Sequence, residues 1–168
     1  MSLLQKIQAA ATTSDRSIGD LLRMALVLSK RLAFEELGSW AKRELNGYEG
    51  ADAPLPAYRR IAAASVGTVV GYGHKATNVQ IMEALLPKSL AEYVGALPMR
   101  EPIAVYQCAV EERHGVVLVP WLPEAVALAN SSAQFGNARL IEAHFRLSQG
   151  AVAAILDCVR TRLLDFCL

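Results

Sequence analysis

The spacing of apolar residues changes along this 168-residue chain, and that change limits the possible folds more than any other feature. Residues 17–32 have the helical period, and one apolar stripe is formed by Ile18, Leu21, Leu22, Ala25, Leu28 and Leu32. Residues 139–148 instead alternate apolar and polar side chains, which is the period of a strand. Because both periods occur in a chain sized for one domain, we predict an α+β fold.

Helix start and stop signals lie near both ends of the chain. Ser17 can cap the helix that carries the stripe, and Asn46-Gly47 supplies residues that tolerate the left-handed conformation ending a third helix. Ser148 can cap a last helix with apolar residues at helical spacing as far as Phe166. We therefore expect an N-terminal three-helix unit and a long C-terminal helix.

A small antiparallel sheet of about three strands is predicted in the middle of the chain. Residues 58–72 and 75–83 flank the turn-like stretch GYGHK and are predicted to form a hairpin, with residues 139–148 as the third strand. Strict alternation divides the third strand into two faces. One face is Ile141, Ala143, Phe145 and Leu147, and the other is Leu140, Glu142, His144 and Arg146. Further helices are predicted for residues 87–97 and 102–113.

Composition narrows the environment and the partners. With 17 basic and 16 acidic residues the net charge is +1, which does not favour a nucleic-acid partner. The uncharged stretches are too short, or too broken by Gly and Pro, to cross a membrane, and the N-terminus does not have the pattern of a secretory signal. We therefore expect a cytoplasmic protein with no membrane partner, in which Cys108, Cys158 and Cys167 are buried thiols.

The sequence lacks the common catalytic and metal-binding motifs. Arg139 and His144 have the Arg-x4-His spacing of HEPN-type ribonucleases, but strict alternation would place them on opposite faces of a strand. His74 and His114 are isolated from other metal-ligand residue types. We expect no metal and no cofactor, and favour a non-enzymatic protein while leaving enzymatic activity open.

Arginines and glutamates are numerous around the predicted three-helix unit. The arginines are Arg23, Arg43, Arg59, Arg60, Arg160 and Arg162, and the glutamates are Glu35, Glu36 and Glu44. Such residues usually form structural ion pairs. A half-buried arginine can also take a phosphate or carboxylate through two parallel hydrogen bonds, so a small-ligand pocket is the alternative.

Four segments, in this order, resemble the AbiTii domain of bacterial abortive-infection and other defence proteins. They are LLRMALVLSKRL, SWAKRELNGY, LPAYR and VRTRLLDF, and the likeness is strongest over residues 17–60. The resemblance implies an N-terminal module attached to varied partners in anti-phage proteins. It provides no catalytic residues to carry over.

The resemblance favours a non-enzymatic interaction or sensor module of a phage-defence protein. The alternative is a toxic effector domain, either a binder of a host target or a nuclease. We expect residues 1–168 to be a single domain excised from the N-terminal part of a longer protein, because no stop signal closes the last helix. The expected partners are an attached or separate effector domain and a second copy docked through the apolar C-terminal helix.

The candidate binding residues lie mainly in the segment with the strongest likeness. They are Arg23, Trp40, Glu44, Asn46, Tyr48, Tyr58 and Arg59. These residues either form a recognition surface or hold the fold together. If their role is architectural, Glu44 and Arg59 should pair where the third helix leads into the first strand.

Overall fold

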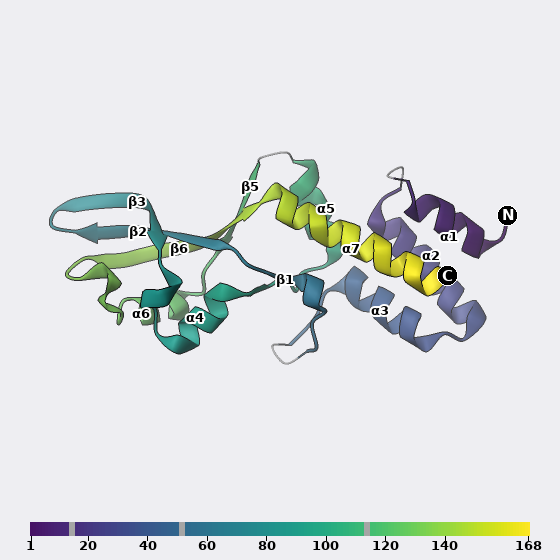
Figure 1. The fold of residues 1–168 in the computed structure, drawn as a ribbon, viewed down its shortest axis with the longest axis horizontal. Helices are drawn as coiled ribbons and strands as arrows, with labels where there is room; N and C mark the ends of the chain where they lie inside the picture. Colours follow the sequence, from purple (N-terminus) through teal and green to yellow (C-terminus); the bar gives the residue numbers. More distant parts are fainter. Residues whose placement is uncertain (14–15, 51–52, 113–114) are drawn as a thin grey trace. The chain divides into compact units, whose positions relative to one another are not determined.

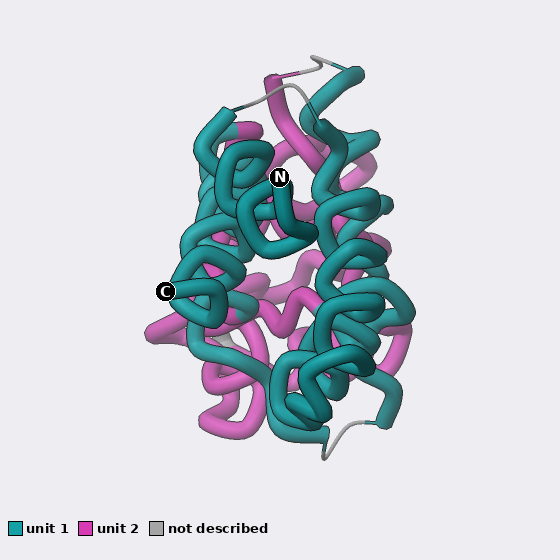
Figure 2. Tube along the Cα trace, turned by 90° about the vertical axis from the view of Figure 1, so that its right-hand side faces the viewer, with its two compact units in different colours: residues 1–59, 100–114, 150–168 teal, residues 60–99, 115–149 magenta. Residues whose placement is uncertain are grey.

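The structure is a computed structural model that describes residues 1–13, 16–50, 53–112 and 115–168. The chain forms two compact units (Figure 2), each assembled from segments that are distant in sequence. The helical unit consists of Met1–Arg59, Arg100–His114 and Gly150–Leu168. The sheet unit consists of Arg60–Met99 and Gly115–Gln149. Together they make the α+β fold that the sequence predicts.

The helical unit contains the helices at both ends of the chain (Figure 1). Its helices are α1 (Leu3–Ala11), α2 (Ile18–Leu32), α3 (Glu35–Asn46), α5 (Ile103–Glu111) and most of α7 (Gln149–Cys167). Helix α2 is the common neighbour of α1, α3 and α5. The core is made of fully buried aliphatic side chains, among them Ile7, Leu21, Leu22, Leu37, Ile103, Ile155 and Leu163. The predicted three-helix unit and long C-terminal helix are confirmed.

Local capping fixes where these helices begin and end. The Ser17 side chain accepts a hydrogen bond from the Asp20 backbone N–H at the start of α2. Gly47 ends α3 with a φ of 88°, and a Cβ there would lie 2.8 Å from the Arg100 carbonyl oxygen. Leu32, assigned to the apolar stripe by its spacing, is exposed because α2 ends at that residue.

The sheet unit is built on a four-stranded antiparallel sheet with the order β3-β2-β6-β5. Its strands are β2 (Ala64–Gly71), β3 (His74–Ile81), β5 (Val116–Pro120) and β6 (Arg139–Ser148). The predicted hairpin and the third strand are confirmed, and β5 adds a fourth strand beside β6.

The predicted first strand is not continuous. Its start is the 3-10 turn η1 (Ala57–Arg59), and Arg60–Ile61 forms the short strand β1, which pairs with β4 (Leu97–Pro98). Only from Ala64 onward does this stretch join the main sheet as β2. Residues 62 and 63 between β1 and β2 are both alanine, which is not a turn signal, so the break was not visible in the sequence.

One face of the sheet is covered by helices α4 (Lys88–Gly95) and α6 (Pro123–Ala129). Phe145 is the largest side chain of the sheet unit that is fully buried, and the rings of Tyr93 and Trp121 lie 5.5 and 5.6 Å from its ring. Short 3-10 turns complete the unit at η2 (Glu83–Leu85) and η3 (Ala133–Phe135). Helices α4 and α5 confirm the two further helices of the sequence prediction, although residue 113 lies outside the described residues.

A β-bulge changes which residues of β6 are buried. Thr68 of β2 lies opposite Glu142, whereas the next residue of β2, Val69, lies opposite Leu140, so Ile141 is an extra residue without a partner. Leu140 is consequently 1% exposed and Ile141 is 49% exposed. The assignment of these two residues to faces was therefore wrong, because strict alternation does not allow for an inserted residue.

The cysteines only partly follow the prediction. Cys167 is buried, and its burial raises the pKa of the thiol, but Cys108 and Cys158 are exposed on α5 and α7. The apolar context of these two residues therefore misled the prediction. None of the helices in the described part of the chain combines the length and hydropathy needed to cross a bilayer.

Candidate functional site

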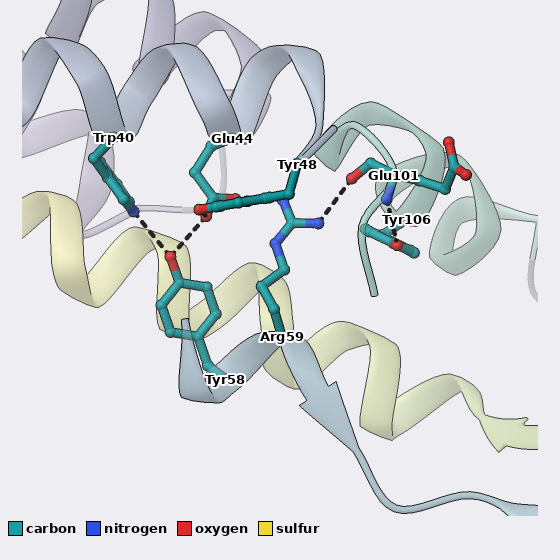
Figure 3. Close-up of polar contacts among 7 residues, drawn as sticks. All are labelled: Trp40, Glu44, Tyr48, Tyr58, Arg59, Glu101 and Tyr106. Atoms are coloured by element: carbon teal, nitrogen blue, oxygen red, sulfur yellow. Dashed lines mark hydrogen bonds and ion pairs between the residues drawn. The ribbon is translucent and has the colours of Figure 1, made fainter. Parts of the chain in front are cut away.

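The centre of the helical unit contains an ion pair with no access to solvent. Glu44, near the end of α3, and Arg59, in η1, are both 0% exposed. The Arg59 Nη2 group donates to Glu44 Oε2, and the other carboxylate oxygen, Oε1, accepts from the hydroxyls of Tyr48 (2.6 Å) and Tyr58 (2.7 Å). Figure 3 shows these side chains converging. Both oxygens of the carboxylate are thus occupied by protein donors.

Arg59 also joins α3 to the segment that precedes α5. Its Nη1 group donates to the Glu101 carbonyl oxygen at 2.8 Å (Figure 3). Its guanidinium carbon lies 5.2 Å from the ring centroids of Tyr48 and of Tyr106. The Tyr106 hydroxyl in turn accepts from the Glu101 backbone N–H at 3.0 Å. A charged side chain therefore holds together parts of the chain more than forty residues apart, as the separation of 42 between Arg59 and Glu101 shows.

The local sequence explains how these groups come together. Tyr48 lies four residues after Glu44, one helical turn on, and the left-handed Gly47 between them redirects the chain as α3 ends. The Tyr48 backbone N–H then donates to the Arg100 carbonyl oxygen at 2.8 Å. The Arg100 Nη1 group donates back to the Gly50 carbonyl oxygen at 2.8 Å, which fixes the turn after α3.

The two phenols stay protonated at neutral pH. Burial, and then the negative charge of Glu44, raise the pKa of Tyr58 to about 12. Burial, followed by the hydrogen bond to Glu44, raises the pKa of Tyr48 strongly in the same direction. Both hydroxyls therefore remain donors to Glu44. Their hydrogen bonds replace those that the carboxylate would make to water and so offset its desolvation cost.

A second layer of side chains surrounds Tyr58. Trp40 Nε1 donates to the Tyr58 hydroxyl at 2.9 Å, and the ring of Phe166 from α7 lies 5.2 Å from that of Trp40. The Arg162 guanidinium lies 5.6 Å from the Trp40 ring, 6.0 Å from the Tyr58 ring and 5.7 Å from the Phe166 ring. All three distances are within the range of a cation–π contact.

The structure brings together most of the residues singled out in the sequence. Trp40, Glu44, Tyr48, Tyr58 and Arg59 form one cluster, which with Tyr106 is called the Glu44–Arg59 cluster below. The predicted pairing of Glu44 with Arg59 is confirmed.

The other two candidates lie outside this cluster. Arg23 has a side chain that is 68% exposed and pairs with Asp20 at 3.0 Å within α2. Asn46 is exposed at the last position of α3. Sequence reasoning missed Tyr106, because nothing in the apolar stretch of α5 distinguishes this aromatic residue from its neighbours.

The ribonuclease-like pair, Arg139 and His144, is placed differently from the sequence prediction. The bulge at Ile141 moves both residues to the same face of β6, so their assignment to opposite faces was wrong. They lie opposite Val70 and Val66, four positions apart on β2, which corresponds to about 13 Å at roughly 3.3 Å per residue. The two residues are therefore separated along the strand and not by opposite orientation.

No group of three or more His, Cys, Asp or Glu side chains suited to a metal ion occurs within residues 1–13, 16–50, 53–112 and 115–168. Of the histidines considered in the sequence, His114 lies outside these ranges. His74 and His144 lie in β3 and β6.

These observations define an α+β protein whose most unusual feature is a solvent-excluded Glu–Arg pair enclosed by tyrosines. The model of the AbiTii family matches residues 2–168, so the chain belongs to the AbiTii family, and the expected resemblance is confirmed over essentially the whole sequence. The family name denotes abortive infection, a defence against phage. No curated protein and no solved structure matches the chain.

Proposed function

We propose that this chain is a non-enzymatic interaction or sensor module of a bacterial, cytoplasmic phage-defence protein. The observation that carries the proposal is that Glu44 and Arg59 are engaged with protein groups inside the Glu44–Arg59 cluster. Each Glu44 oxygen accepts from a protein donor, and Arg59 donates to both Glu44 and the Glu101 carbonyl. The most distinctive polar residues of the segment are thus engaged with one another.

A catalytic carboxylate must come within hydrogen-bond reach of the group from which it takes a proton. Glu44 and Arg59 are 0% exposed, so a substrate would reach them only if the helical unit opened. Their chemistry suits a different task, which is to hold α3, η1 and the start of α5 in one arrangement. A rigid arrangement of this kind favours a surface that presents the same groups to a partner each time.

Apolar side chains on the outside supply contact area for such a partner. In the helical unit Val27, Leu32 and Val105 are exposed, and in the sheet unit Tyr72, Leu118 and Ile141 are exposed. The proposed partner is an attached or separate effector domain. Self-association through the end of α7 is a second proposal, with Leu168 exposed, although Phe166 packs on Phe34 and Trp40 within its own unit.

The proposal is tested by incubating the purified chain with RNA and DNA in the presence of divalent cations. We expect no cleavage of either nucleic acid. Metal-dependent cleavage that His144→Ala abolishes and Arg146→Ala does not would contradict the proposal and favour a nuclease. Growth arrest on expression of the chain, lost together with nuclease activity in His144→Ala, would point the same way.

A further inference from the structure

Within the part of the chain that the structure describes, Arg162 on α7 is a half-buried cation without a carboxylate partner. Among the described residues, the ion pairs join Arg23 to Asp20 and Arg59 to Glu44, and no protein acceptor takes the N–H groups of Arg162. Its guanidinium instead lies over the rings of Trp40, Tyr58 and Phe166. The rings fix the position of the charge and leave the N–H donors unused.

Other arginines of the helical unit show how unusual this is. Arg160, two residues earlier in α7, donates to the carbonyl oxygens of Thr13 (3.0 Å) and Arg16 (2.9 Å). Arg100 donates to the Gly50 carbonyl oxygen, and Arg59 forms an ion pair with Glu44. Partly buried polar groups are normally hydrogen-bonded, so the unused donors of half-buried Arg162 are available to a ligand.

A groove of about 360 Å³ lies beside Arg162, within the volume range of small-molecule sites. Arg43 supplies a second guanidinium to its lining, and Glu36 supplies a carboxylate. The rest of the lining is aromatic, apolar or hydroxylic, and consists of Ser39, Trp40, Tyr48, Pro54, Leu55 and Pro56. Two cationic side chains thus face a partly apolar wall.

We propose that this groove binds a small organic anion through its carboxylate or phosphate group. Arg162 is positioned to take the anionic group, because a guanidinium that contacts rings through its face can still present paired N–H donors at its edge. Arg43 adds charge, and the wall of Pro54, Leu55 and Pro56 contacts the apolar or planar part of the ligand. This inference goes beyond the proposed function, since it holds whether the module acts as a sensor or has another role in defence.

The chain offers a spectroscopic readout that is specific to the groove. It has two tryptophans, of which Trp40 lines the groove and Trp121 lies in the sheet unit. In a nitrogen–proton correlation spectrum, each indole N–H gives one resonance, and a Trp121→Phe variant assigns them. The probes are adenosine monophosphate, inorganic phosphate and succinate, which separate an organic phosphate, the bare anion and a carboxylate.

We expect saturable movement of the Trp40 indole resonance with adenosine monophosphate or succinate, while the Trp121 resonance stays in place. A response to adenosine monophosphate and phosphate assigns the site to phosphates, and a response to succinate assigns it to carboxylates. If no probe moves the Trp40 resonance at up to about 10 mM, weaker than the usual range of specific binding, the proposal is wrong.

Variants test whether Arg162 is the group that binds. Arg162→Gln should weaken binding at least about tenfold, the loss expected for one charge-assisted hydrogen bond. Arg43→Gln should also weaken binding of the probe. Because Arg43 is exposed, this variant replaces Arg162→Gln in the test if Arg162→Gln does not fold. The matched control is Arg31→Gln, which removes the same charge from an exposed position on α2 outside the groove lining. If Arg31→Gln weakens binding as much as Arg162→Gln does, the loss reflects the net charge of the protein and not the groove, and the proposal is wrong.

Discussion

The helical unit and the sheet unit are held together by different kinds of contact. The largest fully buried side chain of the helical unit is charged, namely Arg59. In the sheet unit it is the aromatic side chain of Phe145. Strands β2, β3, β5 and β6 are joined by ladders of backbone hydrogen bonds, interrupted at the bulges. The helices use their backbone groups internally, so polar contacts between them must come from side chains, as in the Glu44–Arg59 cluster.

The difference matters because the helical unit is assembled from three separate stretches of the chain. The Glu44–Arg59 cluster joins the first of these stretches to the second through Glu101 and Tyr106. The contact of Trp40 with Phe166 joins the first to the third. A buried ion pair adds little net stability but disfavours arrangements in which either charge is left unpaired, so we infer that this pair specifies one arrangement of the helical unit.

The largest effect on the difference between the two units is expected when one charge of the Glu44–Arg59 pair is removed. Arg59→Met should lower the free energy of unfolding by about 3 to 5 kcal/mol, because Glu44 is left buried without its cation. Urea unfolding followed by circular dichroism measures the loss. Arg23→Met, which breaks an exposed pair, is the control and should change stability by less than about 1 kcal/mol.

The double variant Glu44→Leu/Arg59→Met sharpens the same test. It should be less destabilised than Arg59→Met alone, since no charge remains buried. If Arg59→Met unfolds at the same urea concentration as Arg23→Met, the cluster is not what distinguishes the helical unit.

In the sheet unit the sensitive contact is one of close packing. A Cβ on Gly67 would lie 2.5 Å from Leu140 Cδ1 and 2.8 Å from the Glu142 carbonyl oxygen, next to the bulge. Gly67→Ala should therefore lower the free energy of unfolding by about 1 to 3 kcal/mol through overpacking. Gln80→Ala, at an exposed position of β3, should change it by no more than about 0.5 kcal/mol, and a thermal melt compares the two. Equal melting temperatures would show that β2 and β6 can move apart at little cost.

A smaller effect is expected when one neutral donor leaves the cluster. Tyr58→Phe removes one hydrogen bond to Glu44 Oε1 and the acceptor of Trp40 Nε1, while Tyr48 and Arg59 still bind the carboxylate. We expect a loss of about 1 to 2 kcal/mol in urea unfolding. Tyr72→Phe, on the exposed turn of the β2–β3 hairpin, is the matched control and should be neutral. A stabilised Tyr58→Phe protein would mean that the tyrosine hydroxyl is not needed to satisfy Glu44.

The last expected effect is absent at neutral pH and concerns alkaline pH. The pKa of Tyr58 rises from 10.0 in the unfolded chain to about 12 in the folded protein, and that of Tyr48 rises further. Above pH 10 the unfolded chain therefore holds fewer protons than the folded one, so stability should fall as pH rises from about 10 toward 12. Tyr58→Phe should make this fall less steep, which urea unfolding at a series of pH values measures. A slope identical to that of the unchanged protein would show that Tyr58 titrates normally in the folded state.

The sequence alone determined those features that depend on neighbours within about one helical turn or along one strand. The apolar stripe fixed α2, the serine and glycine signals fixed helix ends, and alternation identified β6. The pairing of Glu44 with Arg59 was also predictable, because the two residues flank the end of a helix and have opposite charges.

Only the tertiary structure decided the features that depend on residues far apart in the chain. The bulge at Ile141 arises from the register between β2 and β6, and no pattern within β6 reveals it. Tyr106 joins the cluster because the segment before α5 meets Arg59, and the division into two units follows from contacts among distant stretches. The physical reason is that periodicity and capping are read from neighbouring residues, whereas register, bulges and buried ion pairs are selected by packing and hydrogen bonding between segments that the sequence keeps apart.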